Sequence, residues 1–215
     1  MALAAVLLVA GCGGAVATPR ASVGPTGLPA GTYTSKAFKP ALSYTVPAGW
    51  ANDNDTADYF AIRPAVSDAV GISVFQSPLA MSQDKACPDA GEPGVDTSAA
   101  GLAAWIRGLK GLKVSAPRLA AIGGLRGTEI DVEIADGWTF SCSFAGGLPT
   151  VPLFFGRDGD YHWVVAGTEK LRLDILDGPD KSTIVVDVDA FDGVLFDDLV
   201  IASGPITRSF SFKSN

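Results

Sequence analysis

The sequence predicts a single α+β domain, in which helices pack on a mostly antiparallel sheet. Several segments alternate apolar and polar residues, which is typical of strands with one exposed face. Two other stretches space their apolar residues three or four positions apart, which is typical of amphipathic helices. Of the 215 residues 47% are hydrophobic and 18% are charged, a composition that favours a folded core over a disordered chain. Because the helices occur singly and not after every strand, the pattern indicates an α+β class.

Strands are expected at residues 42–46, 59–63, 72–76, 128–134, 161–166, 171–175 and 184–188. The first two should pair as a hairpin through the Pro47–Trp50 turn. Segment 161–166 is apolar on both faces, which favours a central strand. In segment 184–188 and just beyond it, Asp187 and Asp189 fall on the same side, which predicts an exposed acidic face at the rim of the sheet.

The two helices differ in how clearly they are bounded. The first follows the candidate cap Ser98, ends near Gly111 and carries one apolar stripe made of Leu102, Trp105, Ile106 and Leu109. The second is expected from about Asp192 to Ala202. Gly204 and Pro205 should then break or kink it.

The N-terminus predicts export. Residues 1–11 are apolar but too short to span a membrane, and they end in Val9-Ala10-Gly11-Cys12, which resembles a bacterial lipobox. On this interpretation Cys12 is lipidated, residues 12–31 form a Gly- and Pro-rich tether, and residues 32–215 form one domain. The motif lacks a basic n-region before Arg20, so the true start is expected upstream of Met1. The alternative is an ordinary secretory signal.

Two further cysteines, Cys87 and Cys142, remain in the expected mature chain. Thiols of an exported protein mature in an oxidising compartment, so the sequence predicts a disulfide between them. The alternative is a pair of buried free thiols.

The order of elements resembles that of Mog1/PsbP-like domains, which also occur in small actinobacterial lipoproteins. The resemblance covers about residues 38–212 and rests on the Val46–Trp50 turn, the helix ending near Gly111, the hairpin of residues 117–134 and the closing Ser209–Phe212 segment. The Gly- and Pro-rich stretch of residues 136–159 departs from it. The resemblance implies an α/β/α sandwich, a binding or assembly role and no transferable catalytic residues.

Catalytic signals are weak. His162 is the single histidine, and no Gly-x-Ser-x-Gly motif accompanies it. A Cys-His pair would need a free thiolate, which the predicted disulfide excludes. The Gly123–Gly127 segment leads into a strand, so a hairpin turn explains it better than a phosphate loop. No cofactor is expected.

No metal is expected either. The spacing of Asp53, Asp55 and Asp58 does not fit a calcium loop, because Asp58 falls where that loop needs glycine. A weak calcium site made by Asp187, Asp189 and Asp192 is the alternative to a charged rim.

One apolar feature is a candidate ligand or partner surface: Trp138, Phe140, Phe144, Phe154 and Phe155. Pro149 and Pro152 argue against a central strand in this stretch. The alternative is a loop that packs over the core and is held by Cys142.

The net charge of −7 argues against a nucleic-acid partner. Together these features predict a membrane-anchored, extracytoplasmic, non-enzymatic binding or scaffold lipoprotein, with a protein or a small apolar molecule as its partner. The alternatives are a carrier or sensor of an apolar or lipid ligand, and a hydrolase that would need carboxylates converging in one cleft.

Overall fold

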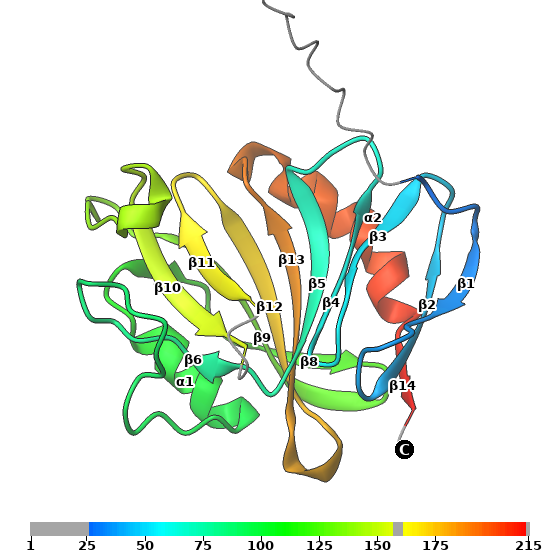
Figure 1. The fold of residues 1–215 in the computed structure, drawn as a ribbon, viewed down its shortest axis with the longest axis horizontal. Coiled ribbons are helices and arrows are strands. Elements are labelled where there is room, and N and C mark those ends of the chain that lie inside the picture. The colour runs from blue at the N-terminus through cyan, green and yellow to red at the C-terminus, as the bar shows by residue number, and fades with distance from the viewer. Residues whose placement is uncertain (1–25, 157–160, 214–215) are drawn as a thin grey trace, which may run out of the picture.

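The computed structural model describes residues 26–156 and 161–213, and at its centre lies an antiparallel sheet (Figure 1). Seven strands follow the order β3-β4-β5-β13-β12-β9-β7, and β8 pairs with β9 beside this path. Their bounds are β3 (Trp50–Asp55), β4 (Tyr59–Pro64), β5 (Val70–Gln76), β7 (Leu112–Val114), β8 (Arg118–Ile122), β9 (Leu125–Ile134), β12 (Lys170–Asp177) and β13 (Thr183–Ala190).

A helix and a small sheet cover each face of the central sheet (Figure 1). One face packs against α1 (Ala99–Gly108) and the sheet β11-β10-β6, whose strands are β6 (Leu79–Ala80), β10 (Thr150–Phe155) and β11 (His162–Ala166). The other packs against α2 (Phe196–Arg208) and the sheet β1-β2-β14, whose strands are β1 (Gly31–Thr34), β2 (Ala41–Val46) and β14 (Ser211–Lys213). Each interface is a separate buried apolar cluster.

The predicted α/β/α sandwich is therefore wrong, although the antiparallel sheet is present. The described residues form fourteen strands and only two α-helices. Seven strands spaced about 4.8 Å apart are about 29 Å wide, whereas one helix is about 10 Å across. A single helix cannot cover such a face, so the small sheets bury the rest of its apolar surface.

The expected first hairpin is also wrong. β2 pairs with β1 and β14, whereas β4 pairs with β3, which the sequence pattern did not reveal. β3 is polar, and it has a bulge between Asn52 and Asn54. The Asn52 side chain stabilises this bulge by donating to the carbonyl oxygen of Asn54 at 3.2 Å. The predicted hairpin of β8 and β9 is confirmed, and Gly123 and Gly124 form its turn at positive φ.

The sequence predicted α1 well. Its N-cap is Ser98, whose Oγ accepts a hydrogen bond from the Gly101 amide at 3.1 Å. Leu102 and Ile106 are buried against the central sheet, as the apolar stripe predicts.

We expect Ser98→Ala to lower the free energy of unfolding by about 1 kcal/mol, because the first turn then loses its capping acceptor. Urea unfolding would measure the loss. Ser98→Thr keeps the hydroxyl and should retain most of the stability. Equal losses in the two variants would contradict the capping role.

α2 runs through Gly204 and Pro205, so the predicted end near Ala202 is wrong. Proline is tolerated here because it lies on the exposed side of the helix. The carbonyl oxygen that loses its amide partner belongs to Ile201, whose side chain is 75% exposed, so water can replace the missing donor.

The positions of β10 and β11 within their sheet differ from those predicted. β11, predicted as central, is an edge strand, and β10 is the middle strand of its sheet despite Pro152. The reason is that β6 pairs only with Phe154 and Phe155, so Pro152 lies outside that ladder. The Pro152 carbonyl oxygen instead accepts a hydrogen bond from the Gln83 side chain at 2.8 Å.

The most consequential correction concerns β13. All eight of its residues are buried, so the predicted exposed acidic rim is wrong. Asp187 and Asp189 lie under β11, which covers this part of the sheet through Trp163. Asp187 and Asp189 do lie on the same side of the strand, as their alternation predicts, but β11, which is distant in the sequence, covers that side.

The predicted signal peptide and lipobox lie outside the described residues. Within the expected tether, Leu28 is bound to the domain, because its amide donates to the Trp50 carbonyl at 2.6 Å. None of the helices in the described part of the chain is long and apolar enough to cross a membrane.

Candidate functional site

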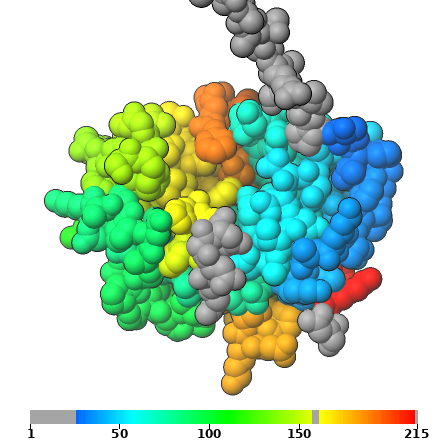
Figure 2. Space-filling view, in the orientation of Figure 1, coloured from blue at the N-terminus to red at the C-terminus, as the bar shows by residue number. Residues whose placement is uncertain are grey.

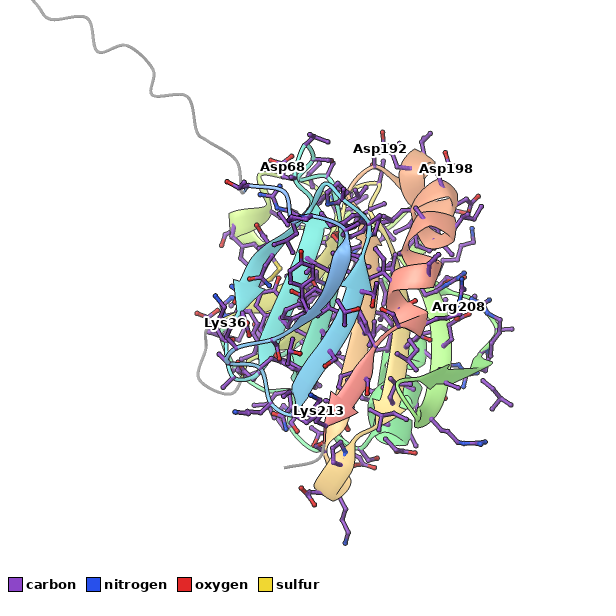
Figure 3. All side chains as sticks on the ribbon, turned by 90° about the vertical axis from the view of Figure 1, so that its right-hand side faces the viewer. Lys36, Asp68, Asp192, Asp198, Arg208 and Lys213 are labelled. Carbon is purple, nitrogen blue, oxygen red and sulfur yellow. A yellow bond between two sulfur atoms is a disulfide. The ribbon has the colours of Figure 1, made fainter. Side chains whose placement is uncertain are left out.

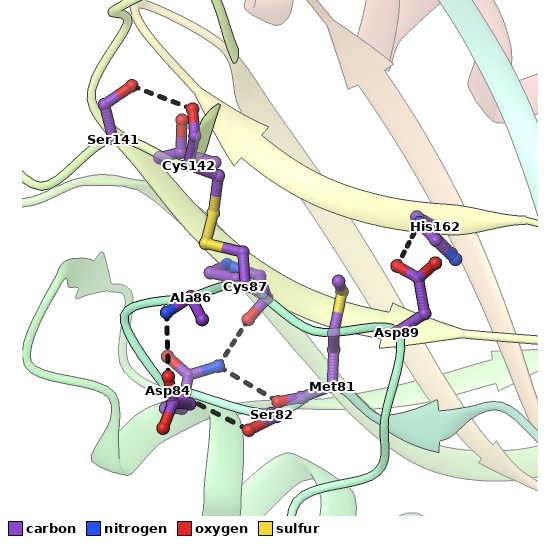
Figure 4. Close-up of a disulfide and its surroundings, with 12 residues drawn as sticks. Met81, Ser82, Asp84, Ala86, Cys87, Asp89, Ser141, Cys142 and His162 are labelled. Carbon is purple, nitrogen blue, oxygen red and sulfur yellow. Dashed lines mark hydrogen bonds and ion pairs between the residues drawn. A yellow bond between two sulfur atoms is a disulfide. The ribbon is translucent and has the colours of Figure 1, made fainter. Parts of the chain in front are cut away.

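The predicted disulfide between Cys87 and Cys142 is confirmed (Figure 4). Its Cα atoms are 5.8 Å apart, and it links the loop after β6 to the turn before β10. The bond is consistent with an extracytoplasmic protein. It also removes both thiols as nucleophiles.

His162 lies on the outer side of β11, opposite the half-buried Trp163. Its Nδ1 is 3.4 Å from a carboxylate oxygen of Asp89, and both side chains are partly exposed (Figure 4). Since Cys87 and Cys142 are bonded to each other, no Cys-His pair forms.

The five residues of the predicted apolar surface point in different directions. Phe154 and Phe155 are buried, whereas Phe144 is 54% exposed. Trp138 and Phe140 contact each other, with ring centroids 6.1 Å apart, and the Trp138 Nε1 donates to a backbone carbonyl of β10. A ligand or partner surface at these residues stays a prediction.

Three buried carboxyl groups gather on the α1 side of the central sheet: Asp187, Asp189 and Glu169, which are at most 4% exposed. The Asp187 Oδ2 accepts a hydrogen bond from the Trp163 Nε1 at 2.6 Å. The other oxygen, Oδ1, is buried and has no hydrogen-bond partner among the described residues. Glu169 accepts from the Ala166 amide at 2.8 Å.

These carboxyl groups hold protons unusually tightly. Burial raises the pKa of Glu169 to about 8, and the charge of Asp189 adds to this effect. Burial and the neighbouring charges of Asp189 and Glu169 also hold the pKa of Asp187 well above its usual value. The pKa of Asp189 is raised less, to about 6, again by burial. The charge of one ionised carboxylate therefore makes its neighbours harder to ionise.

Beside this cluster lies a hollow of about 210 Å³, which we call the Asp189 hollow. It forms where β4, β5, β11 and the end of β13 meet, and these cyan, yellow and orange segments adjoin in Figure 2. Its lining includes Tyr59, Ser73, Trp163, Asp189 and Phe191. Gly71 leaves room for the carboxylate, because a Cβ there would come within 3.2 Å of the Asp189 Oδ1.

The other charged groups that line the hollow leave it negative. Arg63 is already paired, because it donates to Asp53 at 2.8 Å and to the Ser67 carbonyl at 2.9 Å. Asp68 lies exposed at the edge of the hollow. Figure 3 shows Asp68 and Asp192 at one end of the molecule and Lys213 at the other.

The carboxylates that the sequence grouped for calcium are only partly brought together. Asp187 and Asp189 do share a face, but Asp192 instead accepts a hydrogen bond from the Val194 amide and caps the 3₁₀ turn Gly193–Leu195. No group of three or more His, Cys, Asp or Glu side chains in the described part of the chain is arranged to hold a metal ion. The sequence pattern places Tyr59 and Trp163 on strands but does not indicate that they line a hollow.

A second, larger hollow of about 460 Å³ lies between the β8–β9 hairpin and α2. Its buried carboxyl group is Asp174, and burial raises the pKa of this group to about 7. Arg172 and Arg208 also line this hollow, together with Glu129. The opposite charges balance there, which distinguishes it from the Asp189 hollow.

No family model and no curated protein matches this chain. Solved structures similar to it include cyanobacterial PsbP (CyanoP) from Synechocystis sp. PCC 6803, with 9% identity, a TM-score of 0.42 and coverage of 92% of this chain and 99% of that one. They also include a protein from Bacteroides thetaiotaomicron, with 10% identity, a TM-score of 0.38 and coverage of 81% of this chain. The match spans only 46% of the Bacteroides chain. Neither likeness identifies a family, and membership of the Mog1/PsbP-like domains stays a prediction.

Proposed function

We propose that this chain is an exported, lipid-anchored binding domain and not an enzyme. The observation that carries the proposal is the Cys87–Cys142 disulfide, because such bonds persist in oxidising compartments and are rare in the cytosol. The lipobox-like Val9–Cys12 segment supports attachment to the outer side of a membrane through Cys12.

The Asp189 hollow supports binding rather than catalysis. Rigid strands supply most of its lining, which suits a preformed ligand site. Of the three buried carboxyl groups only Asp189 lines it, so the cluster does not present an acid and a base together to a substrate. An apolar or lipid ligand is disfavoured, because it would leave the buried Asp189 charge without compensation.

Cell fractionation tests the proposed anchoring. When the protein is expressed from its own gene in its own host, the wild type should partition into detergent with the membrane fraction. Cys12→Ala should release it from that fraction, because the acceptor of the lipid is gone. The matched control is Cys87→Ala with Cys142→Ala, which removes two other cysteines and should leave the attachment intact. Wild-type protein in the cytosol, or a membrane-bound Cys12→Ala variant, would contradict the proposal.

A further inference from the structure

We infer that the Asp189 hollow binds a small organic cation, a primary or quaternary ammonium ion, with Asp189 as its counter-ion and Tyr59 and Trp163 in its walls. The inference rests on the proposed binding function and names the ligand class of that site.

The first argument is the state of the Asp189 side chain. It is only 4% exposed and it lines the hollow, yet no other side chain in the described residues donates a hydrogen bond to it. The Asp189 backbone amide donates to this carboxylate but does not neutralise its charge. A buried carboxylate without an opposite charge is costly to ionise, and a cation in the hollow would compensate that charge. Asp187 lies on the same face of β13, and its buried Oδ1 has no hydrogen-bond partner in the described chain.

The second argument is the aromatic lining, because a cation over an aromatic face gains electrostatic attraction. The rings of Tyr59 and Trp163 have centroids 6.0 Å apart and are tilted by 56°. The hydrogen bond from Trp163 to Asp187 fixes the indole, so this wall is formed before any ligand arrives. Phe191 also lines the hollow and is 55% exposed.

Size and charge restrict the ligand further. At about 210 Å³ the hollow is smaller than the roughly 300–1,000 Å³ of typical small-molecule pockets, so the ligand has few atoms. Since Arg63 is paired with Asp53, Asp68 and Asp189 leave the lining negative, which excludes anions. The alkyl groups of an organic cation can pack against the aromatic walls, whereas a metal ion would bring bound water and would need more oxygen ligands.

Calorimetric titration of the full chain, with its disulfide intact, tests the inference. The probes are choline, methylammonium and dimethylbutanol, which is the uncharged carbon analogue of choline. We expect at least one of the two ammonium ions to bind in the millimolar range, and dimethylbutanol to bind at least about tenfold more weakly. Failure of both ammonium ions to bind, or equal binding of dimethylbutanol, would overturn the inference.

Variants locate the site. Asp189→Asn is nearly isosteric and removes a buried charge, so it should fold, and it should weaken ammonium binding about tenfold or more. Gly71→Ala should also weaken binding by narrowing the space at the carboxylate. Asp198→Asn removes the same charge from the exposed face of α2 and should have no effect. Unchanged binding by Asp189→Asn would overturn the inference. Because fractionation does not depend on the hollow, failure of this inference and failure of the anchoring can be told apart.

Discussion

Replacing Cys87 and Cys142 together by alanine should lower the free energy of unfolding by roughly 2–4 kcal/mol. The disulfide closes a loop of 55 residues, and opening it restores conformational freedom to the unfolded chain. In the folded state both cysteines are buried, and they fasten a segment of irregular backbone to the turn before β10. Urea unfolding of the variant and the wild type would measure the difference.

Two controls separate the bond from the side chains. Wild-type protein treated with reductant should lose a similar amount of stability, whereas Cys12→Ala should lose none. A double variant as stable as the oxidised wild type would show that the bond does not contribute to the fold.

The buried carboxyl groups should make the protein less stable as the pH rises from about 5 to about 9. Burial raises the pKa of Glu169 to about 8 and that of Asp174 to about 7 in the folded state. Between the ordinary pKa values and these raised values the folded chain holds more protons than the unfolded chain. The stabilisation is therefore complete at low pH, is lost as the pH passes through the raised pKa values, and stays lost above them.

Glu169→Gln isolates the largest part of this effect. The shift of its pKa from 4.5 to about 8 corresponds to about 5 kcal/mol, so the variant should gain up to that amount at about pH 9 and little at about pH 5. Urea unfolding at the two pH values would measure the change. Glu133→Gln is the matched control, because its hydrogen bond with Lys113 lowers its pKa, which places its titration below this range. An unchanged pH dependence in Glu169→Gln would contradict the assignment.

Elements whose cause is local could be predicted from the sequence. β9 alternates between polar and apolar residues from Glu129 to Ile134, and β12 does so from Lys170 to Ile175. α1 has both a cap and an apolar stripe. The disulfide could be predicted because only two cysteines remain after Cys12.

Features that depend on distant parts of the chain could not be predicted. β3 is polar, and it is a strand because β4 pairs with it. Pro205 stays helical because it faces outward. The predicted α/β/α sandwich is wrong because the number of helices needed to cover the sheet depends on its width. That width is known only when all the strands are paired.

The candidate site shows the same limit. The sequence placed Asp187 and Asp189 on one side of their strand, which is correct. The prediction that this side is exposed is wrong, because no local pattern shows that Trp163 of another sheet covers it. Because Asp187 and Asp189 are buried, their pKa values are raised. The segment that was predicted to be an exposed rim therefore contributes to a candidate ligand site.

Intact-mass and non-reducing peptide analysis of the protein from native membranes tests the central claim most directly. The account predicts a chain that begins at Cys12 with acyl mass on it, and a peptide pair joined through Cys87 and Cys142. A cytosolic chain that retains Met1 and carries three free thiols would contradict it.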